Sequence, residues 1–345
     1  MNRAALQVYA GLILVAADTG ALAQSPATNT IPVTADNFIR AESDLYLGKI
    51  VKDGALGKFI HRREPAAIDN QTVIRLNRDT LYSSAVFDLD AGPVVITLPN
   101  AGKRFMSMQV INEDHYDFEV DYGAGRYNFT KAEVGTRYVA MALRTFVDPS
   151  SPQDLKQAHA LQDSVTVQQR NAGRFEVPNW DPISQKKIRD ALLILNDSLP
   201  DLRRAFGSRV QVDQVRHLIG TAAAWGGNPD RDAVYLNVSP SKNDGAAIYK
   251  LSVPAKVPVN AFWSVTVYDG QGYLKKNQYD AYSLNNITAK KSADGSVSVQ
   301  FGGCDGKIQN CLPTMSGWNY IVRLYRPRDD ILNGKWKFPE ARPVN

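Results

Sequence analysis

The chain has 345 residues, 44% of them hydrophobic and 22% charged, a composition that is ordinary for a globular protein of about two domains. Its 40 basic and 35 acidic residues give a net charge of +5. These charges are mixed along the chain and form no basic stripe interleaved with aromatic residues, so the composition argues against nucleic-acid binding.

The first residues have the pattern of a secretory signal peptide. Arg3 gives a positive start, residues 4–17 form an apolar stretch too short to span a bilayer comfortably, and residues 21–23 read Ala-Leu-Ala, an A-x-A cleavage site. We predict cleavage after Ala23 and a periplasmic or secreted mature chain without stable membrane insertion. The alternative, a buried N-terminal helix, is disfavoured because Asp18 interrupts the apolar pattern.

A helix and then a series of strands are predicted next. Apolar residues at helical spacing after Thr34 indicate an N-terminal helix with Thr34 as its N-cap. Between residues 81 and 146, apolar and polar residues alternate, as at 106–110, and turn-forming residues separate the runs. This period of two is typical of strands in a sandwich or barrel. We assign residues 34–149 to an N-terminal β module.

The hydrophobic period changes in the middle of the chain. Asp181 followed by Pro182 is a helix start signal, with an N-cap and a proline at the first helical position. An apolar stripe at helical spacing follows, and a second occupies residues 215–222. We therefore predict a helical connector over residues 150–232.

Alternation returns after the connector. It is clear at residues 249–253, 297–301 and 320–324, and it indicates a C-terminal β module over residues 233–340. The sequence thus predicts a mainly β fold with two β-sandwich modules, a helical connector and an N-terminal helix.

The chain has two cysteines, Cys304 and Cys311. In an oxidising compartment, two cysteines this close most simply form a local disulfide. Only two sulfurs and no histidine lie in this stretch, which does not favour a metal site. The sequence also lacks a P-loop and a G-x-G-x-x-G motif. We predict neither a metal nor a cofactor.

The longest motifs are residues 75–82, which read RLNRDTLY, and several in the C-terminal module. The latter are FWS at 262–264, YD at 268–269, Asn277, DGS at 294–296 and RLY at 323–325. These motifs resemble a two-module bacterial family, the domains of unknown function 1254 (N-terminal) and 1214 (C-terminal). The resemblance covers roughly residues 35–340 and implies jelly-roll-like β modules with accessory helices, but no reaction. The chain departs from the family pattern at 310–313, where it has Asn-Cys-Leu-Pro instead of Asn-Trp-Leu-Pro.

The RLNRDTLY block is the main candidate site. It contains the ligand-binding candidates Arg75, Asn77 and Arg78 and the catalytic candidates Asp79 and Tyr82. An arginine can clamp a carboxylate or phosphate of a ligand. The side chain of Asp79 can act as a base, and the phenol of Tyr82 can act as an acid. The same residue types are also common in turns, where Asn and Asp side chains bond to nearby backbone groups. An Arg–Asp ion pair can also connect the corner of a sheet to the next module. A structural role therefore stays open.

His115 is a further catalytic candidate because it lies in an acidic stretch. Strand alternation would place it on one face with Asp117 and Glu119, where it could act as a general base or metal ligand. The same pattern also describes an ordinary solvated strand.

Trp263 and Tyr268 are candidates for stacking against a sugar ring. Strand alternation places them on opposite faces, so at least one of the two is expected in the core.

The leading functional prediction is an exported protein that binds a small anionic or carbohydrate ligand, or acts as a scaffold. The ligand would lie near the RLNRDTLY block and a groove between the modules. One alternative is a periplasmic hydrolase or lyase with Asp79 or His115 as the base and Tyr82 as the acid; no G-x-S-x-G elbow is present. A second alternative is a structural homo-oligomer.

Overall fold

The computed structural model describes residues 30–71 and 74–344. The predicted signal peptide, residues 1–23, lies outside the described residues. Within them, no helix combines the length and the apolar character needed to cross a bilayer.

The N-terminal module is built from two sheets that pack face to face. The larger sheet has the order β1-β2-β7-β4-β5, and all of its neighbours are antiparallel. Its strands are β1 (Ile60–His61), β2 (Thr80–Asp88), β4 (Met106–Asn112), β5 (Asp117–Asp121) and β7 (Tyr138–Phe146). The smaller sheet is formed by β3 (Val94–Leu98), β6 (Gly125–Phe129) and β8 (Thr166–Gln168). The alternating apolar residues of both sheets meet in one core, as the period of two predicted.

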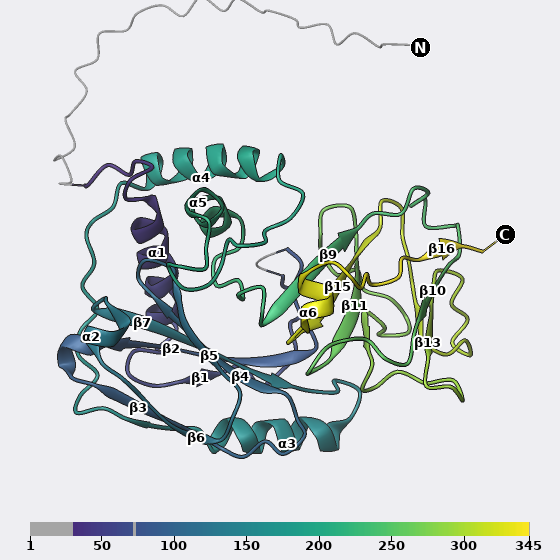
Figure 1. Cartoon of the computed structure of the whole chain (residues 1–345), viewed down its shortest axis with the longest axis horizontal. Helices are drawn as coiled ribbons and strands as arrows, with labels where there is room; N and C mark the ends of the chain where they lie inside the picture. Colours follow the sequence, from purple (N-terminus) through teal and green to yellow (C-terminus); the bar gives the residue numbers. More distant parts are fainter. Residues whose placement is uncertain (1–29, 72–73, 345) are drawn as a thin grey trace, which may run out of the picture.

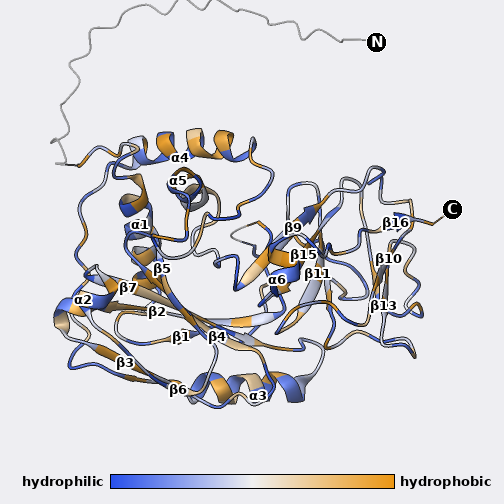
Figure 2. Ribbon diagram, viewed as in Figure 1, coloured by the Kyte–Doolittle hydropathy of each residue, from blue (hydrophilic) through white to orange (hydrophobic). Residues whose placement is uncertain are grey.

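Helices cover the other face of the larger sheet (Figure 1). They are α1 (Phe38–Lys52), α4 (Pro182–Asn196) and α5 (Gln214–Ala223), and they share a small apolar core. Residues of α1 also pack against β2, β4 and β7. Helix α3 (Pro152–Asp163) packs near the end of β7, and two short elements, η1 (Leu89–Ala91) and α2 (Lys131–Val134), complete the module. Figure 2 shows that α1, α3 and α4 each carry both apolar and polar residues, as expected for helices with one buried face.

The helix starts test two local predictions. Asp181 caps α4 by accepting from the backbone N–H of Ser184, and Pro182 occupies the first turn, as predicted. Thr34, in contrast, is not the N-cap of α1. The helix begins after Asn37, whose side-chain oxygen instead accepts from the backbone N–H of Thr34 (2.8 Å), so a turn precedes the helix.

The C-terminal module is also a pair of sheets. One has the order β12-β11-β15-β9 and the other β14-β13-β10-β16. The first contains β9 (Ala233–Val238), β11 (Trp263–Tyr268), β12 (Ser283–Asn285) and β15 (Asn319–Tyr325). The second contains β10 (Tyr249–Val253), β13 (Val297–Phe301), β14 (Cys311–Leu312) and β16 (Arg342–Pro343), and α6 (Asp329–Leu332) follows β15. A large apolar core lies between the two sheets. The predicted mainly β fold with an N-terminal helix is confirmed.

The two modules meet at an aromatic cluster. Phe262 lies 4.3 Å from Tyr325, 5.1 Å from Phe146 and 5.3 Å from Phe105, measured between ring centres. Phe105 and Phe146 belong to the N-terminal module, and the other two belong to the C-terminal one. The cluster therefore joins the two modules through buried apolar surface.

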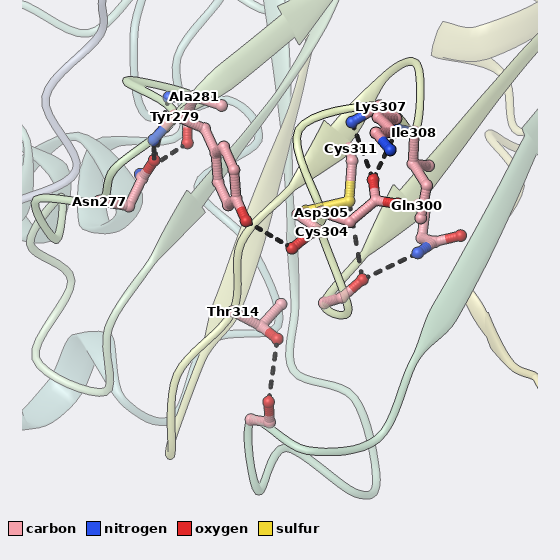
Figure 3. Close-up of a disulfide and its surroundings, with 12 residues drawn as sticks. Asn277, Tyr279, Ala281, Gln300, Cys304, Asp305, Lys307, Ile308, Cys311 and Thr314 are labelled. Atoms are coloured by element: carbon pink, nitrogen blue, oxygen red, sulfur yellow. Dashed lines mark hydrogen bonds between the residues drawn. A yellow bond between two sulfur atoms is a disulfide. The ribbon is translucent and has the colours of Figure 1, made fainter.

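Cys304 and Cys311 form the predicted disulfide (Figure 3). The loop between them is held by additional hydrogen bonds. The Tyr279 hydroxyl donates to the carbonyl oxygen of Cys304 (2.7 Å), and the Asp305 carboxylate accepts from the backbone N–H of Lys307 (2.8 Å). The bridge thus closes a short loop next to β14.

Replacing both cysteines by serine is expected to lower the free energy of unfolding by about 2.5 kcal/mol, because the unfolded chain regains the entropy that the closed loop removes. Urea unfolding of the double variant measures this loss, and the wild type in reducing agent should give the same value. An unchanged midpoint would show that the loop is held by its hydrogen bonds alone.

Candidate functional site

The RLNRDTLY block lies between the modules, and both of its guanidinium groups bind protein groups. Arg75 has a left-handed backbone (φ 58°), and its Nη1 donates to the side-chain oxygen of Asn319 (2.8 Å). Arg78 donates to the carbonyl oxygen of Ala66 and lies over the ring of Tyr282, 5.2 Å from its centre. Both predicted ligand-binding arginines therefore already have partners within the protein.

Asn77 connects the two modules by hydrogen bonds. Its amide nitrogen donates to the hydroxyl of Tyr325 in β15 (3.0 Å) and to that of Tyr82 in β2 (3.2 Å). Its side-chain oxygen accepts from the backbone N–H of Asp79 (2.9 Å), which fixes the turn before β2. Of the three binding candidates in the block, Asn77 is the one that contacts a catalytic candidate.

Asp79 is a deeply buried carboxylate, only 1% exposed. The hydroxyl of Ser264 in β11 donates to its Oδ2 (2.6 Å). Its Oδ1 has no hydrogen-bond partner among residues 30–71 and 74–344. Burial raises the pKa of this carboxyl, although the positive charge of Arg323 opposes the shift.

Arg323, in the centre of β15, is 3% exposed. Together with Asn77, Asp79 and Tyr82 it belongs to a layer of polar side chains between the two modules, called the polar layer below. Its Nη1 donates to the hydroxyl of Thr266 (2.8 Å), and its Nη2 donates to the hydroxyl of Tyr268 (2.6 Å) and the carbonyl oxygen of Arg75 (3.0 Å). No carboxylate in the described part of the chain forms an ion pair with it. Its positive charge is therefore stabilised by the dipoles of these two hydroxyls and this carbonyl group, and by the more distant carboxylate of Asp79.

A second buried arginine, Arg144, lies opposite Tyr82 in the register of β2 and β7 and is 8% exposed. Its Nη1 donates to the side-chain oxygen of Gln109 (2.7 Å), and its Nη2 makes a longer contact with the carbonyl oxygen of Gly226 (3.4 Å). Its guanidinium carbon lies 5.6 Å from the centre of the Tyr82 ring. Like Arg323, it forms no ion pair with any carboxylate of the described residues.

The environment of Tyr82 makes its phenol more acidic than an ordinary tyrosine. Burial by itself would raise the pKa of this phenol, but the charge of Arg144 and the hydrogen bond donated by Asn77 outweigh burial, and the pKa lies below its usual value. Tyr325 has the opposite balance, because burial raises its pKa well above the ordinary value. Tyr82 is thus the more acidic of the two phenols that Asn77 joins.

Solvent reaches this layer despite its position between the modules. Tyr82 and Ser84 belong to β2 and Ala142 to β7, the central strand of the five-stranded sheet, yet each is only half-buried. Tyr235 in β9 is 37% exposed, and its hydroxyl accepts from the side-chain amide of Asn228 (2.7 Å). The polar groups continue across the interface, since Asn77 donates both to Tyr82 in β2 and to Tyr325 in β15. We define the inter-module site as Asn77, Tyr82, Arg144, Tyr235 and Tyr325.

His115 lies in a turn and not on the solvated strand face that alternation predicted. It has φ 60°, precedes β5 and is 2% exposed. The hydroxyl of Thr221 donates to the carbonyl oxygen of His217 (2.8 Å), so it accepts from His115 Nδ1 (2.7 Å). His115 Nε2 then accepts from the backbone N–H of Gly226 (2.8 Å). Burial lowers the pKa of His115 well below its usual value, so the ring is neutral.

The three catalytic candidates are therefore not brought together. Asp79 and Tyr82 both adjoin Asn77, whereas the hydrogen bonds of His115 go to α5 and the following loop. His115 influences the inter-module site indirectly, because it holds Gly226, whose carbonyl oxygen contacts Arg144.

Trp263 and Tyr268 do lie on opposite faces of β11, as alternation predicted. Trp263 belongs to the core of the C-terminal module, and Tyr268 packs against the chain segment before β2. Both rings are buried, so neither presents a face on which a sugar could stack. In addition, no three His, Cys, Asp or Glu side chains of the described residues are grouped as metal ligands would be.

Sequence reasoning missed Arg144, Tyr235 and Tyr325 as site residues. One signal was available for the arginine. It lies in the mostly apolar strand YVAMALRTF. A charged side chain in such a strand is buried at a cost in free energy, which indicates a partner or a functional role.

Comparisons with known proteins agree with this architecture. Residues 56–132 match the family model described as Protein of unknown function (DUF1254), and residues 235–329 match Protein of unknown function (DUF1214). The crystal structure of the VPA0106 protein from Vibrio parahaemolyticus is 19% identical, with a TM-score of 0.69 over 90% of this chain and 98% of that one. An uncharacterized protein from Burkholderia cenocepacia is 15% identical, with a TM-score of 0.51 over 90% and 88% of the two chains.

A search of curated proteins gave no match. The two solved structures share the fold with this chain, and their descriptions state no activity. The chain is a two-module protein of the family pair predicted from its motifs, with an N-terminal DUF1254 domain and a C-terminal DUF1214 domain.

Proposed function

We propose that the protein binds a small organic anion, a carboxylate or a phosphate, at the inter-module site. The observation that carries this proposal is the buried guanidinium of Arg144, which has no carboxylate partner among the described residues. A buried charge without a counter-charge is costly, and an anion that enters from the solvated side of Tyr235 would supply one.

The surrounding groups suit the same ligand. Asn77, Tyr82 and Tyr235 carry polar hydrogens, and arginine can hold a carboxylate or phosphate through two parallel hydrogen bonds. The buried rings of Trp263 and Tyr268 make a carbohydrate less suitable than an anion. Arg75 and Arg78 are half-buried, whereas Arg144 is buried, so the ligand proposal moves from the first two guanidiniums to that of Arg144.

A lyase is the second candidate, and the lowered pKa of Tyr82 favours it. As a phenolate, Tyr82 could accept the proton from the carbon next to a bound carboxylate. The electron pair of that C–H bond would form a carbon–carbon double bond as a substituent on the adjacent carbon leaves with its bonding electrons, and Arg144 would neutralise the developing charge. In this version Tyr82 acts as the base, and neither Asp79 nor His115 is needed for the proton transfer.

We further propose that the mature chain, starting at Gln24, works outside the cytoplasm. The signal-like N-terminus and the disulfide between Cys304 and Cys311 support this location.

Arg144→Gln is expected to reduce ligand-induced stabilisation strongly. A thermal-shift panel of organic acids and inorganic phosphate on the mature protein tests this, because a ligand at 100 times its dissociation constant adds about 2.7 kcal/mol. Loss of the arginine should weaken binding about 10- to 100-fold, the value of a charge-assisted hydrogen bond. Arg126→Gln, on the exposed side of β6, is the matched control.

Tyr235→Phe provides a second test that spares the buried charge. It removes one hydroxyl from a half-solvated position and should weaken the same ligand without unfolding the protein. If no anion stabilises the wild type, or if Arg144→Gln binds as well as the wild type, the inter-module site is not the binding site. A scaffold or oligomer would then be the better hypothesis, and molar mass across concentrations would distinguish these two.

A further inference from the structure

A separate pocket of about 290 Å³ lies where the loops around α5 meet β9 and α6 of the C-terminal module. Part of its wall is apolar and comes from Phe206, Pro229, Val234 and Leu332. Its volume is at the lower end of the range of small-molecule sites. It is distinct from the inter-module site, since the two share no residue.

The rest of the wall is polar and contains several charged side chains. Three arginines, Arg203, Arg204 and Arg231, line the pocket together with one carboxylate, that of Asp230. That carboxylate is already engaged, because it accepts from the backbone N–H of Arg204 (3.0 Å). Among the residues that line the pocket, arginines thus outnumber carboxylates by three to one, next to an apolar surface.

The three arginines differ in their partners. Arg203 lies 3.5 Å from the carboxylate of Asp201, and Arg231 lies 3.3 Å from that of Asp232. The guanidinium of Arg204 makes neither an ion pair nor a hydrogen bond with any residue in the described ranges. Arg204 is thus the free cation of this pocket.

The backbone of Arg204 is held in an unfavourable conformation. Its φ is 60°, a region that costs free energy for residues other than glycine. Two hydrogen bonds maintain it, since its N–H donates to Asp230 (3.0 Å) and its carbonyl oxygen accepts from the backbone N–H of Asp213 (2.8 Å). The loop is therefore constrained at the residue that presents the free guanidinium.

We propose that this pocket, called the arginine pocket below, binds an amphiphilic carboxylate, that is, a carboxylate attached to a short alkyl chain. The carboxylate pairs with Arg204, and the chain lies against Phe206, Val234 and Leu332. The combination of an unpaired guanidinium and an adjoining apolar wall fits this class better than a bare inorganic anion or a sugar.

Calorimetric titration with butanoate, hexanoate and octanoate tests the proposal. Both the wild type and Arg144→Gln are titrated, so that octanoate binding at the inter-module site is distinguished from binding in the arginine pocket. We expect one octanoate per chain and an affinity that falls about fourfold for each methylene removed. Arg204→Ala should weaken octanoate at least about tenfold, as loss of a charge-assisted pair requires.

Two further variants separate the charge from the apolar wall. Arg209→Ala, an exposed arginine of the same loop that does not line the pocket, should leave octanoate binding unchanged. Leu332→Asn should weaken octanoate more than butanoate. The proposal is overturned by absent octanoate binding, by equal affinities for octanoate and butanoate, or by unchanged binding in Arg204→Ala.

Discussion

Arg323→Met should lower the free energy of unfolding by about 3–5 kcal/mol, the usual cost of removing one member of a buried charge system. The guanidinium donates to the hydroxyls of Thr266 and Tyr268 and to the carbonyl oxygen of Arg75. Methionine fills similar volume but donates no hydrogen bond, and it leaves the buried Asp79 without a nearby positive charge. Urea unfolding at neutral pH measures the loss.

Arg328→Met is the matched control, because Arg328 is exposed and bonds to Asn260 at the surface. Its effect should stay within about 0.5 kcal/mol. Adding Asp79→Asn to Arg323→Met should recover part of the lost stability, since the uncompensated carboxylate is then removed. An Arg323→Met protein as stable as the wild type would mean that the polar layer does not hold the modules together.

Asp117→Asn should stabilise the protein at neutral pH and have little effect in mild acid. Burial raises the pKa of Asp117 from 3.8 to about 7, despite the hydrogen bond from Gln109 and the charge of Arg144. The unfolded chain thus ionises this group near pH 4, while the folded protein keeps its proton until about pH 7. Stability contributed by this group falls as the pH rises through that window.

The variant removes this pH-dependent cost. Its gain should grow from near zero at pH 4 to at most about 4 kcal/mol above pH 7, which corresponds to roughly three pKa units. Unfolding free energies at pH 5, 6, 7 and 8 define the curve. Asp294→Asn is the opposite control, because hydrogen bonds from Ser296 lower the pKa of that exposed carboxyl. A constant difference between Asp117→Asn and the wild type at all pH values would contradict the assignment.

Local patterns predicted the elements well. Alternation located strands such as β10 and β15 because each has one face on a core, and the Asp181–Pro182 pair located the start of α4 because capping is a local interaction. The strand-face position predicted for His115 was wrong, since a left-handed turn interrupts the alternation before β5. Periodicity cannot detect one residue of unusual backbone conformation.

The candidate site was only partly predictable. Asp79 and Ser264 are hydrogen-bonded but 185 residues apart in the chain, and no local pattern encodes such a contact. The motif indicated residues that lie at the interface, yet its two arginines are half-buried, while Arg144, outside the motif, is buried without a carboxylate partner among the described residues. A charged residue in the middle of an otherwise apolar strand would have been the better guide.

The aromatic cluster of Phe105, Phe146, Phe262 and Tyr325 has a consequence for how the protein melts. Its rings come from both modules and are packed at distances typical of a single core. Neither half can open without exposing the other half's rings to water, so the chain should denature as one cooperative unit with a single calorimetric peak. The two domains that the family models recognise separately would then not unfold separately.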